Sequence, residues 1–395
     1  MAMVGGFRPE VKRVWNDRVL PPYPFSAVVG LEDLKLALLV NAVSPSIGGV
    51  LVQGETGTAK STLVRGLVGL LPPVPVAPGC LFSCDPAAPD PECLNGPHDR
   101  SAVLRPTRLV ELPAGVTEEQ LTGVLNEDGA YEPGLLAAAH RGVLYVEDVD
   151  LPCGPAAVLL LEAAVTGRVR VERRGLSLRH FSEFLLVGTG GPWRMGRDAW
   201  LCDRFGLAAK AVAIHDPRER AEAVRRRLDY ERDPAGFAAS FAGAEAELSA
   251  RIAVARALLP DVVLGDGALR AVVGVCTGFA LEGLRADLVT ARTAIALAAW
   301  NGRSEVVRED VARAARLALP HRWKEIDHYS GDHPDDDPFE DGERPAEEAL
   351  DATIDEILGR HPFGGERKGG SPEGGGPGPD EADSVEGPLG TGQVA

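Results

Sequence analysis

A phosphate-binding loop constrains the fold of this chain more than any other feature. Residues 54–61 read Gly-Glu-Thr-Gly-Thr-Ala-Lys-Ser, which fits G-x-x-x-x-G-K-[ST] except at Ala59. The loop follows an apolar run at 49–53, which predicts a strand, and precedes 61–71, which predicts a helix. We expect Ala59 to fit because a methyl group is tolerated where φ stays negative.

The chemistry of such a loop identifies its ligand. Backbone N–H groups at the helix N-terminus surround phosphates, and Lys60 brings a positive charge to the β and γ oxygens. The Ser61 hydroxyl is a ligand for Mg²⁺. The sequence therefore predicts an ATP and Mg²⁺ site formed by Gly54, Glu55, Thr56, Gly57, Thr58, Ala59, Lys60, Ser61 and Thr62.

The remaining patterns predict an α/β nucleotide domain with a parallel sheet, followed by an all-α domain. Residues 143–146 and 184–187 are apolar without alternation, as expected for strands covered on both faces. A helix is expected at 34–43, and residues 217–318 have helical spacing throughout. We expect an N-terminal lead-in at 1–24, the α/β domain at 25–216 with an irregular insertion at 76–108, a helical lid at 217–322 and a tail at 323–395.

The charge lies mostly in the tail. The chain has a formal net charge of −17, and the residues from Glu325 onward contain 20 acids and 4 bases. The rest is nearly neutral, which argues against a nucleic-acid-binding surface. The tail is rich in Gly and Pro beyond residue 364 and should be mostly disordered, with one short helix near 346–358. Without an export signal, a membrane-spanning run or enough cysteines for a disulfide scaffold, we expect a cytoplasmic protein that binds no membrane.

Five segments in one order resemble the I subunit of magnesium chelatase and the related ATPase subunits of cobalt chelatase. They are residues 25–39, 54–62, 132–146, 186–190 and 203–207. The resemblance implies an AAA+ ATPase that forms a homo-oligomer, a hexameric ring. It also implies an AAA+ partner subunit with a von Willebrand-type domain and a large porphyrin-binding subunit, which together insert a metal into a tetrapyrrole.

The same resemblance assigns roles to individual residues. Arg204 corresponds to the arginine finger that reaches the ATP of a neighbouring subunit, and Arg285 to the lid arginine that senses the γ-phosphate. Glu147 and Asp148 occupy the places of the carboxylates that hold Mg²⁺ and activate water. Residues 167–179 alternate with period two about a central Arg-Gly, which predicts a β-hairpin.

Three departures from the family pattern indicate slowed hydrolysis. The carboxylate pair reads Glu147-Asp148 where the family has Asp-Glu, so the first side chain is one methylene longer and the second one shorter. A displacement of about 1 Å at such positions can cost 10²-fold in rate. Gly191 stands where the family usually has a sensor asparagine, and the segment 125–131 is shorter than in the family. We expect ATP binding to be retained and turnover to be slow.

The irregular insertion carries a candidate metal site. Its spacing is Cys80-x₃-Cys84-x₈-Cys93-x₄-His98. Three thiolates and an imidazole suit tetrahedral zinc, but no C-x₂-C pair is present, so free thiols or a redox pair remain alternatives. The other cysteines, Cys153, Cys202 and Cys276, are expected to be packed as small apolar residues.

Three functions fit these observations. The first is the motor subunit of a magnesium or cobalt chelatase. The second is a MoxR-like AAA+ chaperone or regulator that remodels a von Willebrand-domain partner and has no tetrapyrrole substrate. The third is a nearly inactive ATP-binding subunit of a mixed ring.

Overall fold

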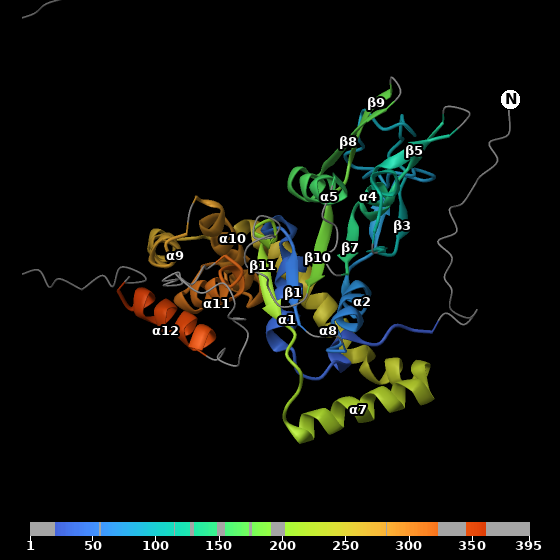
Figure 1. Ribbon diagram of the computed structural model, residues 1–395. Helices are drawn as coiled ribbons and strands as arrows, with labels where there is room; N and C mark the ends of the chain where they lie inside the picture. The colour runs from blue at the N-terminus through green and yellow to red at the C-terminus, as the bar shows by residue number, and fades with distance from the viewer. Residues whose placement is uncertain are drawn as a thin grey trace, which may run out of the picture. The chain divides into compact units, whose positions relative to one another are not determined.

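The sheet domain is built on a five-stranded parallel sheet with strand order β11-β1-β10-β7-β4 (Figure 1). The computed structural model describes residues 20–54, 57–113, 115–126, 130–147, 155–173, 176–190, 202–281, 283–322 and 345–360. The strands of this sheet are β1 (Val50–Gln53), β4 (Leu109–Leu112), β7 (Gly142–Val146), β10 (Phe184–Gly190) and β11 (Leu207–Lys210). The α/β fold with a parallel sheet is therefore confirmed.

The sheet is buried on both faces, as its unbroken apolar strands predict. Val50 and Val52 of β1 pack into one hydrophobic core, whereas Leu51 packs into another. This division arises because successive side chains of a strand point to opposite faces. Helices α1 (Glu32–Val43) and α2 (Lys60–Leu70) contribute to the first core, and α3 (Glu118–Thr122), α4 (Leu135–Ala139) and α5 (Pro155–Thr166) to the second.

An all-α unit follows the sheet, as predicted. Aspartate side chains cap its first two helices: Asp216 accepts a hydrogen bond from the backbone N–H of Arg218 at 2.8 Å, and Asp233 accepts one from that of Gly236 at 3.0 Å. A proline stands at the first position of each of these helices, where no N–H is needed. The helices are α7 (Pro217–Arg232), α8 (Pro234–Leu258), α9 (Asp266–Gly278), α10 (Arg285–Trp300) and α11 (Arg308–Ala318).

The helix predicted within the acidic tail is present as α12 (Pro345–Arg360), and it packs on α9 and α11. Leu350, Ile354 and Leu358 are buried in the same core as the lid helices. Arg316 of α11 lies 2.6 Å from a carboxylate oxygen of Asp351. This helix is therefore part of the packed structure.

Within the described residues, three two-stranded ribbons complete the fold. The predicted hairpin is confirmed as β8 (Arg168–Arg173) paired with β9 (Leu176–Phe181). A second ribbon closes the base of the irregular insertion, because β2 (Val74–Val76) pairs with β3 (Val103–Arg105). The remaining short elements are β5 (Gly123–Leu125) paired with β6 (Tyr131–Pro133), and the 3-10 helices η1 (Phe25–Ala27), η2 (Pro45–Ile47) and η3 (Leu259–Asp261). Within the described part of the chain, no helix has the length and apolar character needed to cross a bilayer.

Candidate nucleotide site

The predicted phosphate loop lines a cavity of about 850 Å³, which is within the usual size range of small-molecule sites. The polar part of its wall comes from the loop and from the carboxyl ends of two neighbouring strands. The residues of this polar end of the cavity are Gly57, Thr58, Ala59, Lys60, Ser61, Thr62, Glu147 and Thr189. Two further loop residues of the prediction, Glu55 and Thr56, lie outside the described residues.

Close packing explains the glycine at the start of the loop. A Cβ atom on Gly54 would lie 2.4 Å from the main-chain oxygen of Ala211, so no side chain fits there. The loop then folds back on itself, since Nζ of Lys60 donates a hydrogen bond to the main-chain oxygen of Gly54 at 2.5 Å. Helix α2 begins at Lys60, so the backbone N–H groups of its first turn are oriented for phosphate binding.

The expectation of a negative φ at Ala59 is wrong. Ala59 has φ of 62° and ψ of 18°, a left-handed conformation. That region costs a residue with a Cβ about 1–2 kcal/mol because the Cβ approaches the following carbonyl oxygen. Leu31, which lines the same cavity, is also left-handed with φ of 60°. The tight turn into α2 therefore requires the conformation for which the motif usually supplies glycine.

The carboxylate and sensor positions are only partly described. Glu147 is exposed, follows β7 directly and lines the cavity. Asp148 and Gly191 lie outside the described residues. Thr189, which no sequence motif singled out, is buried near the end of β10 and lines the cavity. A hydroxyl residue at the carboxyl end of a strand beside the phosphate-loop strand was the available signal, because ligands bind at that edge of a parallel sheet.

Tyr145 connects Thr189 to the neighbouring strand. The phenol of Tyr145 is hydrogen-bonded to the Thr189 side chain, and burial raises the pKa of this phenol above its ordinary value. Tyr145 therefore stays protonated at neutral pH. Both residues line the cavity, so the hydrogen bond fixes a pair of hydroxyl groups at its polar end.

The other end of the cavity is mostly apolar, with two arginines of α7 in its wall, and was not anticipated from the sequence. It joins the segment before α1, the segment after β11 and one face of α7. Such a surface, continuous with a phosphate loop, suits the flat apolar faces of a nucleotide base. The two arginines are Arg220 and Arg227, and the apolar lining residues are Tyr23, Val28, Val29, Leu31, Val212, Ala213, Ile214, Ala223, Val224 and Leu228.

The two arginines assigned from the family resemblance lie together. Nη2 of Arg285 donates a hydrogen bond to the main-chain oxygen of Arg204 at 2.6 Å, and its Nε lies 3.8 Å from a carboxylate oxygen of Asp203. Burial lowers the pKa of Arg285 below its ordinary value. Neither arginine is among the residues that line the nucleotide cavity.

A third arginine, missed by the sequence analysis, holds the segment that carries Arg204. The Arg322 side chain is 4% exposed and donates hydrogen bonds to the Asp203 carboxylate at 3.1 Å and to the main-chain oxygens of Phe205 and Gly206 at 2.5 and 2.9 Å. Burial lowers the pKa of Arg322 to about 10, so the guanidinium stays charged. A lone arginine after the last lid helix gives no signal for this role.

Cys80, Cys84, Cys93 and His98 form a compact cluster, with their donor atoms all within 4.8 Å of one another. Sγ of Cys93 lies 3.7 Å from that of Cys80 and 3.3 Å from Nε2 of His98. Thus the structure brings together the four residues that the spacing suggested. Cys276 is buried, which raises the pKa of its thiol to about 12, and Cys202 is half-buried, whereas Cys153 lies outside the described residues.

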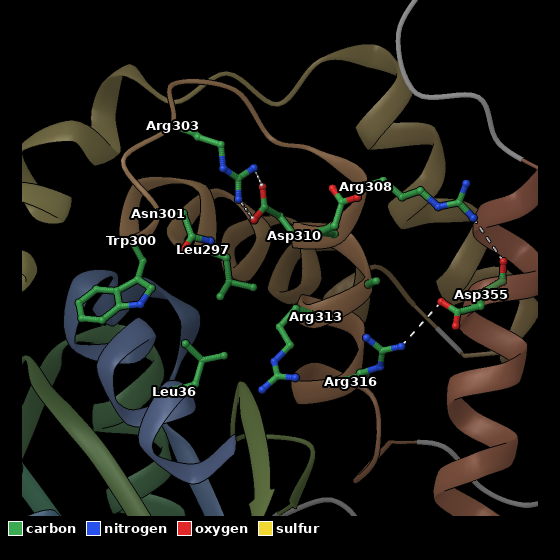
Figure 2. Close-up of a pocket in the computed structure, with 12 residues that line it drawn as sticks. Leu36, Leu297, Trp300, Asn301, Arg303, Arg308, Asp310, Arg313, Arg316 and Asp355 are labelled. Atoms are coloured by element: carbon green, nitrogen blue, oxygen red, sulfur yellow. Dashed lines mark hydrogen bonds and ion pairs between the residues drawn. The ribbon is translucent and has the colours of Figure 1, made fainter. Parts of the chain in front are cut away.

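A second cavity, of about 500 Å³, lies between α1 and the helices α10, α11 and α12 (Figure 2). Two of its arginines face carboxylates: both terminal nitrogens of Arg303 lie 2.7 Å from Asp310, and Arg316 lies 3.7 Å from Asp355. These ion pairs satisfy much of the positive charge within the protein, whereas Arg308 donates to the main-chain oxygen of Asp355. This cavity is therefore a weaker candidate for binding an anionic ligand.

Comparisons with known proteins agree with the fold. A family model described as the AAA lid domain matches residues 269–348. The magnesium-chelatase 38 kDa subunit of Rhodobacter capsulatus is 40% identical over 311 residues, which cover 77% of this chain and 89% of that protein. A magnesium-chelatase subunit ChlI homolog of Methanocaldococcus jannaschii is 39% identical, over 76% of this chain and 86% of that protein.

One relative differs in length. An uncharacterized protein of Mycobacterium tuberculosis is 46% identical over 82% of this chain but only 46% of its own length, so this chain spans about half of that protein.

Among solved structures, a complex between subunits BchI and BchD of magnesium chelatase matches with 39% identity over 78% of this chain and 98% of that chain, at a TM-score of 0.45. A crystal structure from Cytophaga hutchinsonii, at 16% identity, shares the fold with a TM-score of 0.51 over 75% of this chain and 84% of that chain. The high identity over most of two chelatase subunits shows that this chain belongs to the magnesium-chelatase I subunit family of AAA+ proteins.

Proposed function

We propose that this chain is the ATP-hydrolysing motor subunit of a cytoplasmic tetrapyrrole chelatase that inserts magnesium or cobalt. One observation carries the proposal: the phosphate loop of a chelatase-family chain lines a cavity large enough for a nucleotide. The alternative, a MoxR-like regulator without a tetrapyrrole substrate, would use the same ATP site. The two functions therefore differ in what stimulates ATP turnover.

In the proposed site, each part of ATP meets a different group of residues. The phosphates lie against the backbone of the loop and Lys60, whereas the base packs against the apolar end of the cavity. Ser61 and Glu147 hold Mg²⁺, and Asp148 activates the attacking water. When bound, Mg²⁺ neutralises the charge that develops on the phosphate oxygens.

The position of the two arginines supports a ring. Arg204 is exposed and, among the described residues, its side chain has no hydrogen-bond or ion-pair partner in its own chain. Because neither Arg204 nor Arg285 lines the chain's own cavity, we propose that both act on ATP bound by a neighbouring subunit. That role requires a closed homo-oligomer, which we propose to be a hexamer.

Slow hydrolysis is part of the proposal. The exchanged order of Glu147 and Asp148 alters the reach of both carboxylates. Thr189 places a hydroxyl group in the polar end of the cavity, close in sequence to Gly191, where the family usually has its sensor asparagine. We propose that this hydroxyl takes over part of the sensor role.

We also propose that a zinc ion binds to Cys80, Cys84, Cys93 and His98. A Zn–S length of about 2.3 Å puts two sulfurs of a tetrahedral site about 3.8 Å apart, and the Cys80–Cys93 separation is 3.7 Å. A disulfide would need an S–S distance near 2.05 Å. Metal analysis of reduced protein should find one zinc per chain, and its absence would favour the free-thiol alternative.

The proposed partners are an AAA+ subunit with a von Willebrand-type domain and a large porphyrin-binding subunit. ATP turnover should therefore rise when both partners and a tetrapyrrole are added. Turnover that responds to the first partner but not to the tetrapyrrole would favour the MoxR-like alternative.

Assembly is tested on the chain alone. Light scattering should show a ring when Mg²⁺ and ATP are present, and the matched variant Lys60→Ala should stay small because it cannot hold the phosphates. A wild-type chain that remains monomeric at saturating ATP would contradict the ring.

A further inference from the structure

The insertion between β2 and β3 makes contacts that the ATP site does not explain. Across residues 77–102 the structure contains no helix or strand, and the apolar core of this insertion is very small. The fully buried members of that core are Ala77, Phe82, Cys84 and Ala137. A loop of this length with so little buried apolar surface needs another source of order.

The four donor atoms of the Cys/His cluster supply that source. Cys80 and Cys84 lie on either side of Phe82, and Cys93 directly follows Glu92. A metal held by these ligands would therefore fix the backbone beside Phe82 and Glu92, each of which makes a contact outside the insertion. Metal ions commonly order small segments that lack a core of their own.

Both of these contacts reach the β8–β9 hairpin. The ring of Phe82 lies 5.1 Å from that of His180, measured between centroids, and a carboxylate oxygen of Glu92 lies 2.9 Å from Nη2 of Arg179. His180 and Arg179 are neighbours on β9. Figure 1 shows β8 and β9 as a long ribbon projecting from the sheet domain.

The hairpin has a separate anchor, in the hydrophobic core of the sheet domain, through both of its strands. Val169 and Val171 of β8 and Leu178 of β9 are buried in the core that includes α5. The hairpin should therefore form without the insertion, whereas Glu92 and Phe82 of the insertion, each next to or between metal-ligand candidates, contact Arg179 and the ring of His180.

We infer that the metal site is a brace: zinc at Cys80, Cys84, Cys93 and His98 fixes the insertion, and the insertion holds β9 in place. The inference rests on the proposed zinc site. It gives that site a mechanical role separate from nucleotide binding, because none of the four ligands lines the nucleotide cavity.

The test measures metal content and hydrogen exchange on the full-length chain. In the variant Cys80→Ser with Cys93→Ser, zinc should be lost, and amide exchange in residues 177–181 and in the insertion should rise by about tenfold or more. Exchange in α2 should not change. Cys276→Ala is the matched control, since it removes a thiol outside the cluster and should keep both zinc and slow exchange in β9.

A second variant separates metal binding from bracing. Phe82→Ala with Glu92→Gln leaves all four ligands in place, so it should retain one zinc while exchange in 177–181 still rises. Cobalt(II) exchanged into this variant should give the sulfur-to-cobalt absorption of a thiolate-rich tetrahedral site, which shows that the ligands remain assembled.

Each outcome decides a different claim. If zinc is bound but its removal leaves exchange in β9 unchanged, the brace is wrong and the metal site stands. If no zinc is found in reduced protein, both the metal site and the brace fall. Neither result bears on the proposed ATPase, whose failure would appear as absent ATP turnover by the wild-type chain.

Discussion

Nη2 of Arg285 donates a hydrogen bond to the main-chain oxygen of Arg204 at 2.6 Å, across a sequence separation of 81 residues. The bond joins the start of α10 in the helical unit to the segment just before β11 in the sheet. A nucleotide that attracts Arg285 would therefore also act on the backbone of the proposed arginine finger. This link makes the surface around Arg204 the most informative place for mutation.

Mixed rings test whether Arg204 acts on a neighbouring subunit. Arg204→Ala should lower ATP turnover by about 10³-fold or more, with ATP binding unchanged because Arg204 is outside its own chain's cavity. Mixing it with Lys60→Ala should restore part of the activity, since one variant keeps the ATP site and the other keeps the finger. Turnover is measured by phosphate release. No recovery in the mixture, together with weaker ATP binding by Arg204→Ala, would contradict action between subunits.

Arg322 should position the finger rather than touch ATP. Arg322→Ala removes the donor to the Asp203 carboxylate and to four main-chain oxygens, so unfolding free energy in urea should fall by about 2–4 kcal/mol. Turnover should fall with it, while ATP affinity stays near that of the wild type. Arg322→Lys keeps the charge but not the planar fork, and should recover stability better than turnover. Equal recovery of both would show that charge alone is sufficient.

Ala59→Gly should relieve the left-handed strain. The native φ of 62° costs about 1–2 kcal/mol with a Cβ, and the added freedom of glycine in the unfolded chain offsets about 0.4–1 kcal/mol of that gain. We expect a net stabilisation of up to about 1.6 kcal/mol in urea unfolding, with unchanged or tighter ATP binding. Ala77→Gly, at a buried site outside the loop, is the control and should be destabilising.

The double exchange Glu147→Asp with Asp148→Glu should speed hydrolysis. It preserves charge and restores the usual reach of both carboxylates, so turnover should rise by about one to two orders of magnitude. ATP affinity should change little because Lys60 and the loop backbone are unaltered. A lower rate in the double variant would mean that the native pair is already well placed, and the interpretation of a slowed ATPase would then be withdrawn.

Acid should destabilise the fold through His140. Burial, followed by the charge of Arg141, lowers the pKa of His140 to about 4 from 6.5, and its Nδ1 accepts the N–H of Glu183 at 3.1 Å. Between pH 6.5 and 4 the unfolded chain therefore binds more protons than the folded chain does. The stability that neutral His140 provides is fully present above pH 6.5 and is lost as the pH falls through this range. By pH 5 the loss in unfolding free energy amounts to about 2 kcal/mol.

The His140 contribution is isolated by subtraction. His140→Asn retains a side-chain acceptor, and urea unfolding at pH 7.5 and pH 5 gives its share of the pH dependence. From pH 7.5 to pH 5, the unfolding free energy of the variant should fall by about 2 kcal/mol less than that of the wild type. Buried His180 and His321, whose pKa values are also lowered, should leave some pH dependence in the variant. Identical pH dependence in both proteins would show that His140 is not the responsible group.

The sequence by itself determined the elements whose signals are local. The motif at 54–61 with its flanking apolar and helical runs specified β1 and α2, because backbone geometry and phosphate chemistry act over a few residues. Period-two alternation specified the β8–β9 hairpin, and helical spacing specified the lid and α12. Likewise, the unbroken apolar character of β7 and β10 predicted a sheet buried on both faces.

Only the tertiary structure decided how distant segments meet. The left-handed φ at Ala59 follows from the tight turn into α2, and the apolar end of the cavity exists because α7 lies beside the segments at 28–31 and 212–214. Arg204, Arg285 and Arg322 come together from three parts of the chain. The four residues of the Cys/His cluster come together within one irregular loop. Local pattern does not fix such placements, because they depend on which surfaces pack together once the elements have formed.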